Sequence, residues 1–477
     1  MFLDGLVPSP DWLNAGDTGW QLTAATLVGL QSVPGLAILY AGLMKRKWAL
    51  NSALMVLYAF AMTLLIWTLW SYNMGFGQSA KLFGQDIIGM PSPVNFAQSE
   101  LQQATIPLLT SSGSLPPLRF PLSAMVYFQF VFGAITVIIL GGALLGRMNF
   151  KAWMLFVPLW MTVVYPVGAF LIWGGGWLAQ GPFGLPGAVD YSGGYVIHVA
   201  AGISGVVAAA VVGPRLLKDR QENNPSNLLM AIAGGGLLWL GWNGFNGGDP
   251  YTANADAAAA VLNTNLSTAT ALIVWMLLDV FMTGKSNVAG MVNGMIAGLV
   301  AITPGAGWVN GFGAIIIGAV AAVIPWFTMQ YLPRVNFFKK IDDTLGVMHT
   351  HLFPGAIGGL MVGLIADPAM VIYPGSGKTA DSAVTGLFYG NPKQFLAQAI
   401  ALAVIVVYDF AATFVVIRLV GFLVPLRMPH AHLEVGDEMV HGDVSLDLGV
   451  PKLGVEPPSV PVTHYDPPGG ALPQPTG

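Results

Sequence analysis

Two stretches of the chain share one pattern: residues 190–205 read DYSGGYVIHVAAGISG, and residues 343–358 read DTLGVMHTHLFPGAIG. Each begins with an aspartate, carries a histidine eight residues later, and continues as His-x3-Gly-x2-Gly. Each copy also opens a long apolar segment. A pattern that occurs twice at this separation predicts a chain built from two related halves.

The segments around these stretches are too apolar for a water-soluble protein. Of 477 residues, 55% are hydrophobic and 9% are charged, whereas a soluble domain carries about 25% charged residues. This composition, with a net charge of −4, excludes an ordinary cytosolic enzyme and a nucleic-acid binder that depends on a basic face. The chain has no cysteine, which excludes disulfides, thiolate metal sites and cysteine nucleophiles.

Charge-poor segments long enough to cross a bilayer recur along the chain. A spanning helix needs about 20 mostly apolar residues. One segment, 286–333, is too long for a single helix and is interrupted by the sequence TPGAG at 303–307, so it is counted as two spans. The eleven predicted spans lie within 18–44, 48–80, 120–146, 152–189, 191–214, 223–248, 257–278, 286–333, 344–366 and 394–426.

The distribution of basic residues orients these spans. With the N-terminus outside, fifteen of the nineteen lysines and arginines fall on the inner side, as the positive-inside rule requires. The predicted fold is therefore an all-α polytopic membrane protein with eleven transmembrane helices and a cytosolic C-terminus. Spans one to five and six to ten form an inverted repeat, which places its site at the repeat interface near the membrane midplane.

The predicted organisation has three parts. Residues 1–17 form an extracytoplasmic N-terminus, and residues 427–477 form a cytosolic tail. Residues 18–426 form the transmembrane domain, with repeat one at 18–214, repeat two at 223–366 and a last span at 394–426. Residues 77–119, rich in proline, serine and glutamine, are predicted to form an outer loop.

The repeated stretches supply the first candidate functional residues. Asp190 and Asp343 are plausible helix N-caps, and the glycine pairs permit close helix approach. His198 and His351 lie at membrane depth, where a polar side chain is a functional candidate; the alternative is that each merely bonds a neighbouring helix. His349 lies about 200° around the helix from His351 and is predicted to be structural.

Two buried histidines suit a particular chemistry. Neutral imidazoles can share one proton, with one donating and one accepting, but a bare cation in an apolar path costs many kcal/mol. A basic amine can instead lose its proton there, since desolvation lowers the pKa of an ammonium group. Aromatic side chains can first gather the cation. With no third ligand near the two histidines, no metal site is predicted.

Several further segments occur together with these histidines. They are Pro34-Gly35-Leu36-Ala37, Phe128-Gln129 with Phe132, Trp173-Gly174-Gly175-Gly176, Gly241-Trp242-Asn243-Gly244-Phe245-Asn246, Thr252-Ala253-Asn254 and Asp342-Asp343. Together they resemble the ammonium transporter/Rhesus family over nearly all of residues 18–445. The Asp-Asp-Thr…His-Thr-His sequence looks like a bacterial member similar to the plant type-2-like branch.

The resemblance implies roles for the aromatic and histidine side chains. It implies an outer ammonium site, a stacked phenylalanine gate and a twin-histidine lumen, with Asp190 as a structural carboxylate behind the outer site. In the second stretch the aspartate that often precedes the histidine by five residues is Gly346 here, which leaves Asp343 and Thr344 as the candidates for the cap. The residues that match are Phe128 and Trp173 in the outer site with Trp242 nearby, Phe132 above Phe245 in the gate, and His198 and His351 in the lumen.

One position departs from the family pattern in the outer site. Where many members have a serine, this chain has Asp249. An acidic side chain there either strengthens cation capture or points into solvent, and the sequence leaves both alternatives open. We include Asp249 among the predicted substrate-binding residues.

The resemblance implies a function as well. An ammonium transporter recruits NH4+ outside, deprotonates it, and conducts NH3, with or without the proton, past the histidines; methylammonium is a second substrate. The family implies a homotrimer in the plasma (cell inner) membrane, in contact with lipid, with a PII-type regulatory protein as a possible cytosolic partner. No enzymatic activity, cofactor or nucleic acid is expected. The alternative is an ammonium sensor with low flux that signals through its tail.

Overall fold

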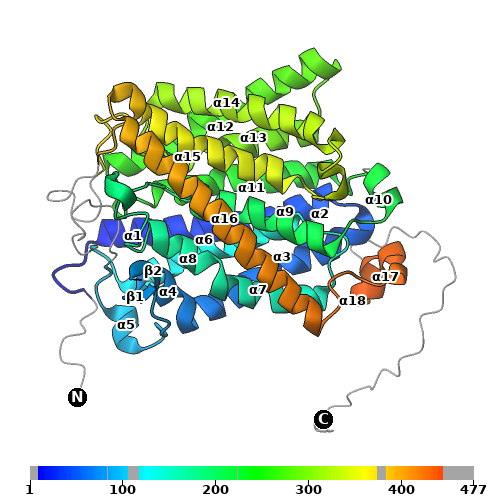
Figure 1. Cartoon of the computed structure of the whole chain (residues 1–477), viewed down its shortest axis with the longest axis horizontal. Coiled ribbons are helices and arrows are strands. Elements are labelled where there is room, and N and C mark those ends of the chain that lie inside the picture. Colours follow the sequence, from blue (N-terminus) through cyan, green and yellow to red (C-terminus); the bar gives the residue numbers. More distant parts are fainter. Residues whose placement is uncertain (1–8, 83, 106–117, 223, 373–382, 444–477) are drawn as a thin grey trace, which may run out of the picture.

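The structure is a computed structural model that describes residues 9–82, 84–105, 118–222, 224–372 and 383–443. Long helices lie side by side and form one bundle (Figure 1). Within the described residues the only sheet is a hairpin of two antiparallel strands, β1 (Ser79–Leu82) and β2 (Gln85–Gly89). The hairpin lies within residues 77–119, which the sequence predicts as an outer loop, and the described structure is otherwise helical as predicted. Gly84, with φ +77°, provides the left-handed conformation that the turn between the strands requires.

Ten helices in the described part of the chain are long and apolar enough to cross a membrane. They are Ala15–Leu43 (α1, η1, α2), Arg46–Phe76 (η2, α3, η3, α4), Leu122–Gly142 (α6), Phe150–Ile172 (α7, α8), Gly194–Val212 (η5, α9), Leu228–Gly247 (α11), Ala255–Thr283 (α12), Gly311–Arg334 (α14, η6), Met348–Ile365 (η8, α15) and Pro392–Leu423 (α16). A shorter apolar helix, α13 (Val288–Ile302), follows α12 and precedes α14 along the chain. The break predicted in segment 286–333 is therefore present, and the chain is a multi-pass membrane protein.

Several of these spans change helix type along their length. Their parts are Ala15–Leu30 (α1), Gln31–Gly35 (η1), Leu36–Leu43 (α2), Arg46–Trp48 (η2), Ala49–Ile66 (α3), Trp67–Ser71 (η3), Tyr72–Phe76 (α4), Phe150–Val163 (α7), Tyr165–Ile172 (α8), Gly194–Val199 (η5), Ala200–Val212 (α9), Gly311–Tyr331 (α14), Leu332–Arg334 (η6), Met348–Leu352 (η8) and Phe353–Ile365 (α15). The short helices outside the spans are Ala97–Leu101 (α5), Pro182–Gly184 (η4), Leu217–Gln221 (α10), Phe338–Lys340 (η7), Leu387–Tyr389 (η9), His430–Val435 (α17) and Asp437–His441 (α18).

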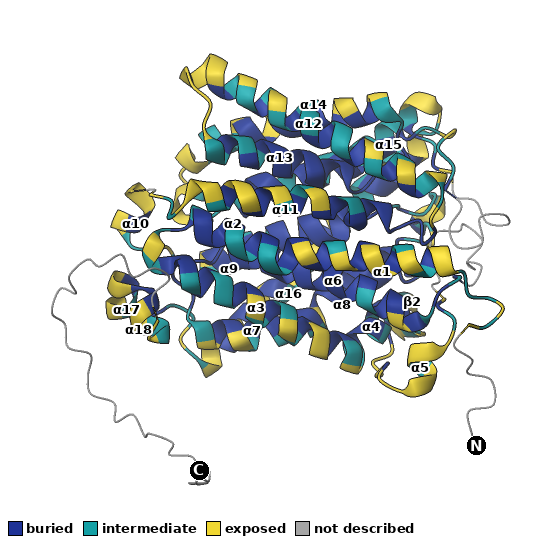
Figure 2. Ribbon diagram, turned by 180° about the vertical axis from the view of Figure 1, so that it is seen from behind, coloured by how far each residue is buried: buried dark blue, intermediate teal, exposed yellow. Residues whose placement is uncertain are grey.

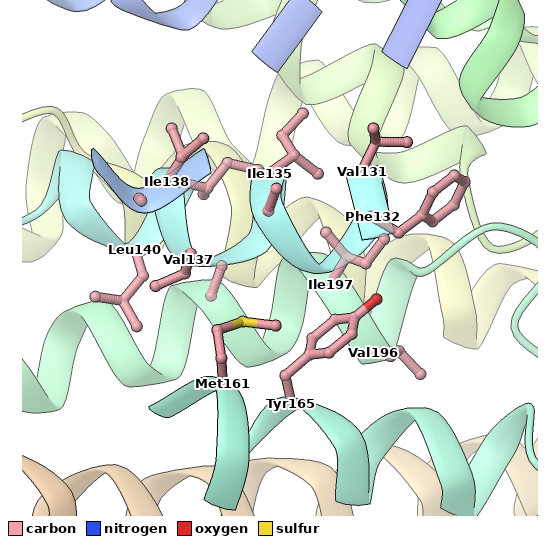
Figure 3. Packing of buried hydrophobic residues seen from close by; sticks show 14 of the residues in the cluster. Val131, Phe132, Ile135, Val137, Ile138, Leu140, Met161, Tyr165, Val196 and Ile197 are labelled. Atoms are coloured by element: carbon pink, nitrogen blue, oxygen red, sulfur yellow. The ribbon is translucent and has the colours of Figure 1, made fainter. Parts of the chain in front are cut away.

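Helix α6 forms the centre of the bundle. Nearly all of its residues are buried, and Figure 2 shows buried helices in the middle with exposed residues toward the periphery. In Figure 3, α6 side chains such as Val131 and Ile135 lie in the same buried cluster as Tyr165 of α8 and Ile197 of η5. The peripheral helices expose large apolar side chains, with Phe281, Phe312 and Phe422 each about four-fifths exposed. Such a surface suits a lipid environment.

A buried arginine joins the two halves at the end opposite the hairpin. Arg147, which follows α6, donates through Nε to the Gly213 carbonyl at 2.7 Å and through Nη1 to the Thr344 hydroxyl at 2.6 Å. It also donates to the Asp342 carbonyl. Arg215 holds the Asp342 carboxylate through Nε at 2.9 Å and Nη2 at 2.8 Å. These bonds fix the chain immediately before the second repeated stretch.

The described part of the predicted tail is docked on the bundle. Asp437, at the start of α18, is buried, and its carboxylate accepts from the backbone N–H groups of Leu50 at 2.8 Å and Asn51 at 2.9 Å. These are first-turn amides of α3, and the N-cap residue of α3, Trp48, makes no side-chain cap bond. Asp437 therefore caps α3 from a distant part of the chain.

We expect Asp437→Ala to release the tail while leaving the bundle folded. The substitution removes two charge-assisted bonds at a helix N-terminus, which contribute roughly 1–3 kcal/mol. Limited proteolysis should reveal new cleavage between residues 429 and 443. Glu438→Ala, a change at the exposed neighbour, is the control. An unchanged cleavage pattern in the Asp437 variant would show that the cap does not hold the tail.

Candidate conduction site

Asp190 organises the start of the first histidine helix. Its carboxylate is buried and accepts four backbone N–H bonds: Oδ1 from Gly193 at 3.2 Å and Gly194 at 2.6 Å, and Oδ2 from Tyr195 at 2.8 Å and Val196 at 3.0 Å. Burial raises the pKa of Asp190 to about 6, and the four hydrogen bonds oppose that rise. The carboxylate thus satisfies the free amides at the N-terminus of η5.

Asp343 has the matching position in the second stretch. Its Oδ1 accepts from the Val347 N–H at 2.9 Å and its Oδ2 from the Met348 N–H at 2.8 Å. Burial raises its pKa, and these two bonds oppose the rise. Because Asp343 holds two amides where Asp190 holds four, the two halves are similar but not equivalent.

The glycines of the pattern let the two histidine helices meet. A Cβ on Gly202 would lie 2.7 Å from the backbone nitrogen of Leu352, next to His351, and a Cβ on Gly355 would lie 2.6 Å from the Gly194 carbonyl oxygen and 3.0 Å from the His198 Cβ. Each repeated stretch therefore uses a glycine to pack against the histidine segment of the other. Larger residues would force the helices apart.

The structure brings the two predicted histidines into contact. His198 and His351 are buried, their Nδ1 atoms lie 3.2 Å apart, and their ring centroids lie 5.3 Å apart. One Nδ1 must donate and the other accept, so the rings share one proton. The Nε2 of His198 is buried without a hydrogen-bond partner in the described residues. Both histidines lie in π-helical turns, η5 and η8, a feature frequent at functional sites.

His349 lies elsewhere, as its helical spacing predicted. Its Nδ1 is 3.0 Å from the Thr328 hydroxyl of α14, and its ring packs against Phe353 with a centroid distance of 6.0 Å. The helical turn thus separates the two histidines, and His349 makes its contacts away from His198.

Aromatic rings continue in a column from the histidine pair. Trp242 stacks on His198 with centroids 5.5 Å apart and on Phe245 with centroids 4.7 Å apart. Phe245 in turn stacks on Phe132 at 4.4 Å, with an interplanar angle of 20°. Phe245 also stacks directly on His198, with centroids 6.0 Å apart, so Trp242 flanks both rings on the inner side of Phe132, whereas the resemblance implied a place near the outer site.

The remaining aromatic residues lie on the other side of Phe132. The Phe128 and Phe132 centroids are 4.7 Å apart, and Trp173 meets Phe132 edge to face at 6.2 Å. The Trp173 indole donates to the Asp190 carbonyl at 2.6 Å. Phe128 and Trp173 therefore lie at one end of the aromatic column, and the histidines at the other.

Asp249 lies beside these outer aromatic residues rather than in open solvent. It is 5% exposed and accepts a hydrogen bond from the Ser192 hydroxyl, whose oxygen is also 2.9 Å from the Phe245 carbonyl oxygen. A Cβ on the preceding Gly248 would overlap the edge of the Phe128 ring. Among the residues that the structure describes, no lysine or arginine forms an ion pair with Asp249.

Two positioning residues were not among the predicted site residues. Ser192 holds Asp249, and the Thr303 hydroxyl accepts from the Trp242 indole at 2.9 Å. The Thr303 carbonyl also accepts from the Ser192 N–H at 3.1 Å. The repeat gave no signal for Ser192, because its counterpart in the second stretch is Leu345. In the sequence Thr303 belongs to the predicted break between two spans, a position that does not mark it as a site residue.

No group of three or more histidine, cysteine, aspartate or glutamate residues in the described part of the chain is arranged to hold a metal ion. The arrangement instead offers cation-attracting ring faces and a buried carboxylate at one end. At the other end it offers a proton-sharing imidazole pair. Such a site suits capture of a small cation and passage of its neutral form.

Comparisons with known proteins agree with this chemistry. A family model described as Ammonium Transporter Family matches residues 19–445. The chain is 50% identical over 441 residues to ammonium transporter 3 member 3 of Oryza sativa subsp. japonica, covering 91% of this chain and 90% of the relative. It is 49% identical over 443 residues to ammonium transporter 2 of Arabidopsis thaliana, covering 92% and 90%. The predicted similarity to the plant branch is thereby confirmed.

A solved structure has the same fold. The crystal structure of Candida albicans Mep2 superposes with a TM-score of 0.74 at 26% identity, covering 89% of each chain. The family match extends from α1 through both repeated stretches to the docked tail. On these grounds, the chain is a member of the ammonium transporter family.

Proposed function

We propose that this protein transports ammonium across the membrane, conducting NH3 past the paired histidines. The observation that carries the proposal is the contact between His198 and His351, with Nδ1 atoms 3.2 Å apart, at the inner end of a stacked aromatic column. The named plant relatives are ammonium transporters. A pair of neutral imidazoles can form hydrogen bonds with ammonia without requiring a bare charge in an apolar path.

The proposed path begins at the outer aromatic residues. Phe128 and Trp173 attract NH4+ through their ring faces, and Asp249 adds a negative charge beside them. The stacked rings of Phe132 and Phe245 then close the route to a hydrated ion, so the ammonium must lose its proton before it passes. NH3 next meets Trp242 and the free Nε2 of His198, and it leaves past His351.

Membership of the family supports proposals about the assembly, the membrane, a second substrate and a partner. We propose a homotrimer with one path per subunit in the cell inner membrane, with methylammonium as a second substrate and the docked tail as the face for a PII-type regulatory protein. The named relatives are transporters, so we propose transport without enzymatic turnover. The unit that acts is the transmembrane domain, 18–426.

Uptake of labelled methylammonium tests the proposal. Cells lacking their own ammonium transporters should take up label when they express the full chain, and excess ammonium should compete with it. A Phe132→Trp, Phe245→Trp double variant, which enlarges the gate rings, is the matched control and should take up little. Expression of folded protein at the membrane without uptake would contradict transport and favour the low-flux sensor.

A further inference from the structure

Asp249 is an unusual group for the position it occupies. It is a carboxylate at 5% exposure, beside the Phe128 ring, and the hydrogen bond found for it in the described structure comes from a neutral serine. A buried carboxylate without a cationic partner is strongly destabilised in its charged form. The site is therefore completed either by a bound cation or by a proton.

Its neighbour Asp190 is not available for the same task. Both Asp190 oxygens are occupied by backbone amides, two on each oxygen. Among the described residues, Asp249 receives the Ser192 hydroxyl alone, on Oδ2. The histidines lie beyond the stacked gate rings. Asp249 is thus the carboxylate of the outer site with lone pairs free to accept a proton.

We propose that Asp249 is the base that removes the proton from ammonium before the gate, and that Ser192 is its positioning residue. This inference rests on the proposed transport function. One N–H bond of NH4+ breaks and its electron pair stays on nitrogen, while an O–H bond forms on the Asp249 carboxylate. The products are NH3, which passes Phe132 and Phe245, and a neutral carboxylic acid, which returns its proton to water on the outer side.

The surrounding charges suit this role. Burial raises the pKa of Asp249 well above that of an ordinary carboxyl group; the Ser192 bond opposes the rise and the charge of Asp190 adds to it. The titratable groups near Asp249 also include the buried phenols of Tyr191 and Tyr251, whose pKa values are raised first by burial and then by the charge of Asp249. A raised pKa makes the carboxylate a better proton acceptor for an ammonium ion than a solvated aspartate.

The sign of the pH dependence follows. The base is present above the pKa of Asp249 and is lost as the outer pH falls through it. Because that pKa is raised, uptake should decline at a higher pH than an ordinary carboxyl group would allow. Methylammonium remains protonated throughout the acidic range, so the concentration of the protonated substrate does not change with the outer pH.

The test uses the full chain in proteoliposomes, with labelled methylammonium uptake measured from outer pH 8 to pH 5. Uptake by the wild type should decline on the acidic side of this range, and we call this decline the acid limb of the pH profile. Asp249→Asn keeps the shape and can still accept from Ser192, but it cannot take a proton, so we expect at least a tenfold lower rate and no acid limb. Asp249→Glu should keep the limb at a shifted pH. Asp256→Asn, at an outer carboxylate bonded to Asn254, is the control and should match the wild type.

Ser192 gives an independent readout. Ser192→Ala removes the bond that lowers the pKa of Asp249, so the acid limb should move to higher pH, and Ser192→Thr should restore it. An Asp249→Asn protein with the wild-type rate and pH profile would overturn the inference while leaving transport intact. If that variant does not fold, Asp249→Ser takes its place: an Asp249→Ser protein whose uptake still declines at acidic pH would also overturn the inference. A wild type without any uptake overturns the proposed function and this inference together.

Discussion

Asp190→Asn is expected to reduce the stability of the protein by about 3–5 kcal/mol and to abolish measurable uptake. The asparagine keeps one acceptor oxygen and replaces the other with an NH2 group. That NH2 group is a donor and faces backbone N–H groups, which are also donors. Two of the four backbone bonds to Gly193, Gly194, Tyr195 and Val196 are therefore lost. With them goes the start of η5, which holds His198 against its partner.

The measurement is thermal unfolding in detergent together with methylammonium uptake. Asp343→Asn is the matched control, because Asp343 receives one backbone bond on each oxygen and the same change removes one bond rather than two. The loss of stability in Asp343→Asn should be about half as large as that in Asp190→Asn. Equal losses at the two positions would mean that the number of capped amides does not determine the effect.

Those features of the fold that depend on a single segment were predictable from the sequence. A bilayer sets the length of an apolar helix, so local composition predicts the break after Ile302 and the ten helices of spanning length in the described residues, whereas α13 is shorter than a predicted span. The caps were predictable for the same reason, since Asp190 and Asp343 each bond amides within six residues. The helical period also placed His349 away from His351.

Contacts between distant segments were not predictable. Trp242 lies against His198 because Thr303, sixty-one residues later, accepts from its indole, and no local pattern encodes that bond. The sequence does not decide between cation capture and solvent for Asp249, because its environment depends on Ser192, fifty-seven residues away. The cap that Asp437 places on α3 spans nearly the whole chain, and an acidic tail segment gives no sign of it.

The family resemblance supplied site residues that spacing alone did not. Composition could not select Phe128, Phe132 and Phe245 among 25 phenylalanines. Their arrangement as a stack depends on helices α6 and α11 meeting, with a Phe132–Phe245 centroid distance of 4.4 Å. The residues of a membrane site are thus better predicted from recurring motifs than from hydropathy, because hydropathy is uniform along a span.

The histidine pair gives the second large expected effect. His198→Ala and His351→Ala should each lower methylammonium uptake by about 10- to 100-fold, which corresponds to about 1.4–2.7 kcal/mol in the transport barrier. Each substitution leaves the other ring with a buried, unpaired Nδ1 and removes the proton shared at 3.2 Å. Since the rings act through one shared proton, removing the second ring should add little.

The double variant therefore distinguishes a coupled pair from two independent contacts. We expect its uptake to be no more than about threefold below that of the less active single variant. If the two effects were independent, the loss would instead be the product of the two single losses. His349→Gln is the control: its ring bonds Thr328 on another helix, so uptake should stay close to that of the wild type. Losses that multiply would mean that His198 and His351 contribute separately. Uptake unaffected in the double variant would remove the histidines from the mechanism and leave the aromatic residues and Asp249 to account for selectivity.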